Sequence, residues 1–207
     1  MLVIGLTGGI GTGKSTVSET LKQLGAVVLD ADKVGHEAYL PHSETWKRLV
    51  DAFGQGILQS SGEIDRKKLG ALVFSDPKHL ATLNSIVHPR IVEMMLEKLE
   101  GLRKQSIQVA VVEAAILVEA GWTRIVDEVW VTVAPETVVV KRILGRNPNL
   151  TEAQVRERIR SQITSEERNK HAHVVIDTDC TFDEVREKVK VLWRERVGER
   201  GLVRHGG

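Results

Sequence analysis

The chain has 207 residues, of which 42% are hydrophobic and 28% are charged, so it is long enough for one folded domain and too apolar to be disordered. Its 29 lysines and arginines nearly balance 28 aspartates and glutamates, and a net charge of +1 gives no general attraction to nucleic acid or to a membrane surface. Because Cys180 is the single cysteine and no apolar run approaches the roughly 20 residues that cross a bilayer, we expect a soluble protein in the reducing cytoplasm. We also expect a monomer.

Short apolar runs alternate with longer helical patterns, which is typical of a parallel β-sheet covered by helices. Five runs are almost continuously apolar, as strands buried on both faces require. They cover Leu2–Leu6, Ala26–Leu29, Ile107–Val112, Glu128–Val133 and His173–Ile176. We therefore expect an α/β fold with a five-stranded parallel sheet flanked by helices.

The second and third strands are separated by far more chain than a crossover needs. Helical patterns in this stretch cover Glu44–Phe53, Arg66–Phe74, Lys78–Ile86 and Pro89–Lys104. Ligands of open α/β sheets bind at the carboxyl ends of the strands, where such insertions begin. We assign residues 35–104 to a helical substrate-binding insertion.

An arginine-rich helical segment follows the fourth strand. Residues Thr137–Leu144 predict one helix, and Thr151 with Gln154 forms a capping-box pattern at the start of another, Glu152–Gln162. We expect residues 146–171 to form a lid in which most arginines of the second helix face solvent. The arginines within or just before that helix are Arg146, Arg156, Arg158 and Arg160.

The remaining segments complete a single domain over residues 1–207. Thr181 and Glu184 form another capping-box pattern, which predicts the start of the last helix. We expect the core to comprise 1–34, 105–145 and 172–197, and the glycine-rich end, 198–207, to be frayed.

A phosphate-binding motif follows the first strand and precedes a helix, in the pattern G-x-x-x-x-G-K-[ST]. Its glycines let backbone N–H groups turn toward phosphates, Lys14 reaches the β- and γ-phosphate oxygens, and Ser15 can ligate Mg²⁺. A dinucleotide fingerprint is excluded because it requires glycine where Lys14 stands. We expect a P-loop fold that binds ATP, with Mg²⁺ as cofactor, through Gly8, Gly9, Gly11, Thr12, Gly13, Lys14, Ser15 and Thr16.

Two aspartates, Asp30 and Asp32, follow the second strand, which we expect to lie beside the first. A carboxylate at that edge can accept the proton of a hydroxyl group that attacks the γ-phosphate, and we choose Asp32 as this catalytic base. The alternative is that either aspartate caps a helix starting near Lys33.

Further charged residues are expected to serve the metal and the transferred phosphoryl group. Glu113 ends the third strand, where P-loop proteins hold a carboxylate near Mg²⁺, so Ser15 and Glu113 are the expected metal site. A structural carboxylate paired with Lys14 is the alternative. Arg142 and Arg146 are one helical turn apart and are the expected catalytic cations, together with Lys14.

The motif alone leaves several P-loop classes open. A GTPase switch needs the guanine-reading motif Asn-Lys-x-Asp, and the near match, residues 169–172, ends in Ala172. A helical insertion with an arginine-rich lid favours a small-molecule kinase over a switch or a motor. The acceptor could be a nucleoside or a nucleoside monophosphate.

Four segments together resemble the dephospho-CoA kinase family. They are Gly5–Thr16, Val28–Asp32, Leu83–Pro89 and Leu117–Glu119, and the similarity spans nearly the whole chain. The resemblance implies a kinase that uses ATP to phosphorylate the ribose 3′-hydroxyl of dephospho-CoA, in the last step of coenzyme A synthesis. It also implies acceptor contacts from Asp32, Arg66, His88 and Glu119, although a histidine before a proline can equally be a cap or a packing residue.

Three departures from the family pattern accompany the resemblance. Residues 113–122 look more like the kinase domain of the animal bifunctional CoA synthase, and Glu113 replaces the aspartate of typical bacterial members. Asn147 and His173 each stand where the family carries aspartate. Only the replacement at Glu113 bears on the expected metal site.

Overall fold

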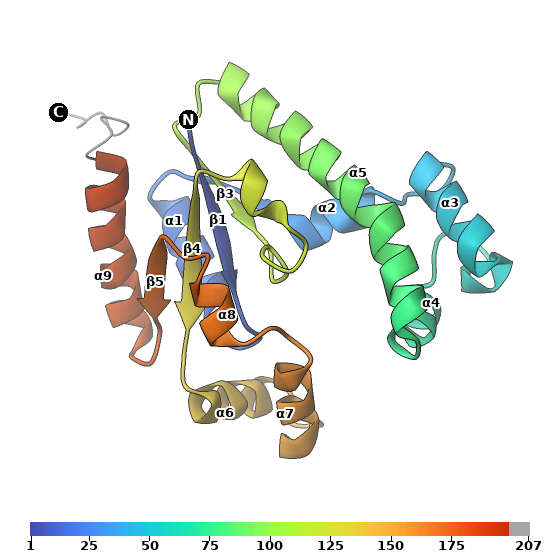
Figure 1. Ribbon diagram of the computed structural model, residues 1–207. Coiled ribbons are helices and arrows are strands. Elements are labelled where there is room, and N and C mark those ends of the chain that lie inside the picture. Colours follow the sequence, from blue (N-terminus) through green and yellow to red (C-terminus); the bar gives the residue numbers. More distant parts are fainter. Residues whose placement is uncertain (199–207) are drawn as a thin grey trace. The chain divides into compact units, whose positions relative to one another are not determined.

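The computed structural model describes residues 1–198 and contains a five-stranded parallel sheet in the order β2-β3-β1-β4-β5 (Figure 1). The strands are β1 (Leu2–Gly8), β2 (Val27–Asp30), β3 (Val109–Glu113), β4 (Glu128–Val133) and β5 (Val174–Asp177). The strand predictions are confirmed to within a few residues. The expected frayed tail lies outside the described residues, except for Gly198, which ends the helical turn η3 (Arg194–Gly198).

The chain divides into two compact units. One comprises Met1–Leu29 and the chain from Gly101 on, and the other comprises Asp30–Glu100. The first contains the sheet and the phosphate-binding loop, and the second contains the helices that precede β3. Within the described residues, no helix is both long and apolar enough to cross a membrane.

Alternation along β1 directs apolar side chains to both faces of the sheet. Leu2, Ile4 and Leu6 pack with helices α1 (Lys14–Gln23) and α9 (Phe182–Trp193) in one buried cluster. Figure 1 shows α1 and α9 on the same side of the sheet. On the other face Gly5 leaves room for Leu117, because an added Cβ would lie 2.8 Å from the Leu117 Cδ2 atom. This double coverage explains why β1 is almost continuously apolar.

The prediction that β2 lies beside β1 is wrong. In the sheet β3 lies between β2 and β1, and β1 pairs with β3 and β4, with Leu6 opposite Glu113. Strand order depends on how each crossover returns to the sheet, and the residues of a single strand do not encode it. Glu113, rather than an aspartate of β2, therefore stands beside the carboxyl end of β1.

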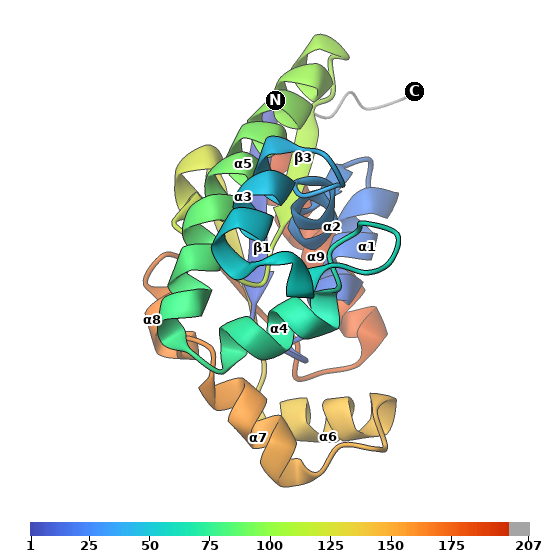
Figure 2. The ribbon, with the colours of Figure 1, turned by 90° about the vertical axis from the view of Figure 1, so that its right-hand side faces the viewer.

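Three helices follow β4, and the second and third of them lie in the expected lid, 146–171, where one helix was expected. They are α6 (Glu136–Arg146), α7 (Glu152–Arg160) and α8 (Ser165–Asn169). Val139, Val140, Ile143 and Val155 form a small buried cluster between α6 and α7, and the predicted capping box of Thr151 and Gln154 is present. Figure 2 shows α6 and α7 side by side. Helices α6 and α7 thus share a small apolar core.

The second unit is helical and ends in a long helix. Its elements are α2 (Ala31–Glu37), α3 (Glu44–Phe53), η1 (Gln55–Ile57), α4 (Arg66–Phe74) and most of α5 (Pro77–Lys104). We expected two helices where α5 runs unbroken through Pro89. Proline removes only its own N–H, whereas the buried stripe of Ile86, Val87, Ile91, Val92, Met95 and Leu99 continues along the helix on both sides of it. Packing of that stripe outweighs the lost hydrogen bond.

Candidate active site

The phosphate-binding loop connects β1 to α1 and is fixed by contacts with β4. Gly8 has no room for a side chain, because an added Cβ would lie 2.1 Å from the Thr132 hydroxyl oxygen. That hydroxyl is 2.8 Å from the Thr12 hydroxyl, and Thr12 also donates to the Gly9 carbonyl at 2.8 Å. Both threonines are buried. The loop conformation is therefore set by packing, which preorganises its N–H groups.

The end of the loop gives α1 an open amino terminus. Gly13 is the N-cap residue in the left-handed conformation, with φ of 87°, and has no side chain that could cap the helix. No side chain therefore caps the first N–H groups of α1, and the helix dipole adds positive potential there, a combination suited to binding an anion. Lys14 Nζ donates to the carbonyls of Gly8 at 2.7 Å and Gly9 at 3.3 Å. The ammonium group is thereby held over the loop.

Arg142 and Arg146 line one small pocket at the start of α1, as their spacing predicts. The pocket also includes Gly13, Thr16 and Thr178. Arg142 is half-buried and also donates to the Gly11 carbonyl at 3.5 Å, whereas Arg146 is exposed. The structure thus brings both arginines to the loop, but only Arg142 is held firmly.

Ser15 and Glu113 offer oxygen donors suited to Mg²⁺. Ser15 lies in the first turn of α1, and Glu113 ends β3 next to the strand that enters the loop. Each has a side-chain oxygen that can ligate a metal ion. In this range no cluster of three or more metal-binding side chains occurs. Such a donor set fits Mg²⁺, which is often bound by one or two protein ligands together with phosphates and water.

In the second unit the two neighbouring aspartates differ in what they contact. The Asp30 carboxylate caps α2, accepting from the N–H groups of Asp32 at 3.0 Å and Lys33 at 3.2 Å. Asp32 is exposed in the first turn of α2, and its carboxylate accepts no hydrogen bond within the described part of the chain. The capping alternative therefore applies to Asp30 and leaves the Asp32 carboxylate available.

Charged side chains of the second unit gather around His36, one turn after Asp32 on α2. Burial lowers the pKa of His36, the positive charge of Arg66 lowers it further, and the negative charges of Asp32 and Asp30 oppose both. Asp32 and Arg66 therefore both lie close enough to the His36 imidazole to change its pKa. Two residues expected to contact the acceptor thus share one charged cluster.

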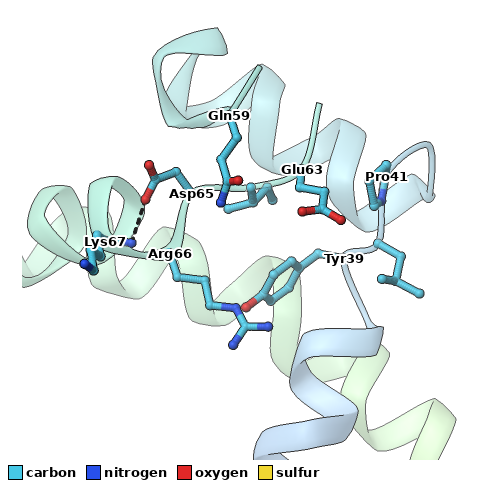
Figure 3. Close-up of a pocket in the computed structure, with 9 residues that line it drawn as sticks. Tyr39, Pro41, Gln59, Glu63, Asp65, Arg66 and Lys67 are labelled. Atoms are coloured by element: carbon cyan, nitrogen blue, oxygen red, sulfur yellow. Dashed lines mark hydrogen bonds between the residues drawn. The ribbon is translucent and has the colours of Figure 1, made fainter. Parts of the chain in front are cut away.

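Arg66 also extends into a cavity of about 650 Å³ within the second unit. Figure 3 shows Arg66 and Tyr39 pointing toward one another there, with Gln59 and Glu63 on the cavity wall. Arg66 makes no hydrogen bond or ion pair among the described residues. Burial raises the pKa of the Tyr39 phenol, and Arg66 opposes that rise. The lining carries two carboxylates, Glu63 and Asp65, as well as the cations Arg66 and Lys67, so the cavity suits a polar ligand with an anionic group near Arg66.

His88 is half-buried on α5, away from the lining of that cavity as far as the structure describes it. Burial lowers the pKa of His88, so the neutral imidazole is favoured. Its position in the middle of α5 removes the helix-cap alternative, because no helix begins at Pro89.

Comparison with known proteins identifies the family. The family model for dephospho-CoA kinase matches residues 2–184. The chain belongs to the dephospho-CoA kinase family. A dephospho-CoA kinase of Dehalococcoides mccartyi is 42% identical over 197 residues, which cover 95% of this chain and 98% of the relative. The resemblance inferred from the four sequence segments is therefore confirmed.

Solved structures agree with the family assignment. The crystal structure of TT1252 from Thermus thermophilus has a TM-score of 0.79 at 31% identity, covering 94% of this chain and 97% of that one. Dephospho-CoA kinase from Campylobacter jejuni has a TM-score of 0.72 at 26% identity, with coverage of 96% and 98%. The similarity extends over the sheet, the helical insertion and the lid region alike.

Arg168 is a candidate functional residue that the sequence patterns do not predict. Its guanidinium is 2% exposed and pairs with Glu119, the residue expected to contact the acceptor, at 3.0 Å. Thr164 caps the short helix α8 and Glu167 follows three residues later, a pattern that could have predicted this helix. No pattern in the sequence signals that Arg168 is buried. In this structure Glu119 is therefore the ion-pair partner of Arg168.

Proposed function

We propose that the chain transfers the γ-phosphoryl group of ATP to the 3′-hydroxyl of the ribose of dephospho-CoA, giving coenzyme A and ADP, the final step of coenzyme A synthesis. The observation that carries this proposal is the preorganised phosphate-binding loop in a chain that the family model matches over residues 2–184. The proposed setting is the cytoplasm, where one unpaired cysteine stays reduced.

We assign the nucleotide to the first unit. The loop N–H groups and Lys14 would bind the β- and γ-phosphates, and Arg142 would stabilise the charge that develops during transfer. Ser15 and Glu113 would hold Mg²⁺, which neutralises phosphate charge when bound. The proposal rests on where these groups lie around the loop, from Gly8 to Thr16.

We assign the acceptor to the second unit. Asp32 would accept the proton of the ribose hydroxyl as it attacks, because its carboxylate is not used as a helix cap. Arg66 would bind an anionic group of the acceptor, and His88 remains a proposed contact. Glu119 remains a proposed contact, since only its Oε1 atom accepts from Arg168.

The experiment is to measure ADP release from Mg-ATP with dephospho-CoA, adenosine, AMP or no acceptor, and to weigh the product by mass spectrometry. We expect turnover with dephospho-CoA and a product one phosphate heavier that co-migrates with coenzyme A. Turnover with AMP or adenosine instead would reassign the acceptor, and acceptor-independent hydrolysis would contradict the kinase.

A matched pair of lysines on α1 provides the control. Lys14→Met should abolish transfer, because it removes the loop ammonium, whereas Lys22→Met should leave it intact, because Lys22 is exposed in the last turn of the same helix. Equal loss in both variants would indicate damage to the helix rather than to the site.

A further inference from the structure

Arg168 is a buried cation with most of its hydrogen-bonding capacity unused. It is 2% exposed, and Nη2 donates to Glu119 Oε1 at 3.0 Å. Its buried Nε has no partner among the described residues. A guanidinium carries five N–H donors, and buried polar groups are nearly always hydrogen-bonded. The unused donors point to a partner that is not part of the chain.

The guanidinium lies against the first half of the phosphate-binding loop. Its Nη1 atom is 3.8 Å from the position that a Cβ on Gly9 would occupy. Gly9, Gln162 and Arg168 line one cavity of about 370 Å³. The Gln162 side chain accepts from the Ile10 N–H at 2.9 Å, and Lys14 donates to the Gly9 carbonyl. Two cations, Lys14 and Arg168, thus approach the same glycine.

The glycine at position 9 is not required by the backbone. Its φ is not positive, and an added Cβ would meet no atom closer than 3.4 Å, the Gln162 side-chain oxygen. An alanine would therefore fit the loop without a clash. Its methyl group would, however, occupy the space between the loop and Arg168. The absence of a side chain keeps that space open.

The charges around this cavity favour an anion. Its charged lining residues within the described chain are Glu136, Arg160 and Arg168. Glu136 is already paired with Arg156, and Glu119 accepts from only one nitrogen of Arg168. Arg160 and Arg168 therefore leave positive charge on the lining. Arg168 also contributes a buried N–H donor, Nε, that has no partner among the described residues. A phosphoryl oxygen matches both features.

We propose that Arg168 binds the terminal phosphoryl group of the nucleoside triphosphate and that Glu119 is the positioning residue that holds the guanidinium beside Gly9. The inference rests on the proposed nucleotide site, but not on the identity of the acceptor. Glu119 offsets part of the cost of burying the cation and fixes the plane of its guanidinium, which a lysine at this position could not provide.

The test compares affinities for Mg-ATP and Mg-ADP by calorimetric titration without any acceptor, because only ATP carries the terminal group. In Arg168→Met and Gly9→Ala we expect Mg-ATP affinity to fall about tenfold or more, since a charge-assisted hydrogen bond is lost or blocked. Mg-ADP affinity should change less than about threefold, as for loss of an ordinary contact. Arg168→Lys and Glu119→Gln should give intermediate ratios.

Arg186→Met is the matched control, since Arg186 is an exposed arginine with one carboxylate partner, Asp183, at 2.8 Å. It should leave both affinities unchanged. If folded Arg168→Met and Gly9→Ala proteins keep the wild-type ratio of ATP to ADP affinity, Arg168 serves packing only and the proposal is wrong. If Arg168→Met does not fold, Gly9→Ala and Arg168→Lys decide by the same ratio. Failure to phosphorylate dephospho-CoA would overturn the acceptor alone, because this ratio is measured without one.

Discussion

Arg142 on α6 donates from both terminal nitrogens to one residue, Thr178: Nη1 reaches the hydroxyl oxygen at 3.0 Å and Nη2 the carbonyl oxygen at 2.5 Å. The Thr178 hydroxyl in turn donates to the Thr12 carbonyl at 2.9 Å. The guanidinium is therefore connected to the phosphate-binding loop both directly, at the Gly11 carbonyl, and through Thr178. A cation fixed in this way needs little reorganisation when charge develops on a phosphoryl group.

We predict that Arg142→Met lowers kcat by about 10²-fold or more, because a preorganised charge-stabilising group is lost. Arg142→Lys should recover only part of the activity, since an ammonium cannot make the two parallel bonds to Thr178. Arg146→Met should cost less than Arg142→Met, because Arg146 is exposed. The measurement is steady-state turnover at saturating ATP and acceptor. Equal losses at Arg142 and Arg146 would contradict the importance of the Thr178 contact.

Substitutions of Asp32 and Asp30 should affect different properties of the protein. Asp32→Asn should cut turnover by about 10²-fold or more while Mg-ATP affinity stays near normal, as expected for removal of a general base. Asp30→Ala should instead lower the free energy of unfolding by about 0.5–2 kcal/mol, because it removes the N-cap of α2. Denaturant unfolding and turnover, measured on both variants, separate the two roles. Unchanged turnover in Asp32→Asn would remove Asp32 from the mechanism.

Much of the sheet was predictable because β1, β3 and β4 are buried on both faces, which leaves a direct apolar signal in the sequence. The loop from Gly8 to Ser15 was predictable for a similar reason, since its chemistry depends on residues adjacent in the chain. The place of β3 between β2 and β1 was not, because strand order depends on how crossovers pack. The ion pair of Glu119 and Arg168 joins residues 49 positions apart, so no local pattern encodes it.

The half-buried histidines of the second unit predict a loss of stability in acid. Burial lowers the folded-state pKa of His36 and of His88, the charge of Arg66 adding to the effect on His36. As the pH falls from about 6.5, the usual histidine value, toward the lowered pKa, the unfolded chain binds more protons than the folded one. The stabilisation is therefore full above that window and declines as the pH falls through it.

Urea unfolding at pH values of about 5.5, 6.5 and 7.5, which are centred on the usual histidine pKa, would measure this linkage. His88→Asn should reduce the decline, whereas the same change at the exposed His171 should not. A decline that is identical in His88→Asn and wild type would show that His88 does not contribute.

Replacing Pro89, in the middle of α5, should stabilise the protein and weaken acceptor binding. Pro89 is exposed and supplies no N–H to the carbonyl of Ser85 one turn earlier, so Pro89→Ala should raise the free energy of unfolding by about 1 kcal/mol or more. Restoring the regular helix would also change the turn that carries His88. We therefore expect the KM for the acceptor to rise while the KM for ATP stays constant.

Gly101→Ala is the matched control on the same helix, because an added Cβ there meets no atom within 4 Å. It should stabilise the protein by about 0.5–1 kcal/mol without altering either KM. If Pro89→Ala stabilises the protein and leaves the acceptor KM unchanged, then Pro89 has no part in acceptor binding, and His88 loses its main structural argument as a contact. If both KM values rise in Pro89→Ala, the change reaches beyond the turn around His88, and a local effect on the acceptor is excluded.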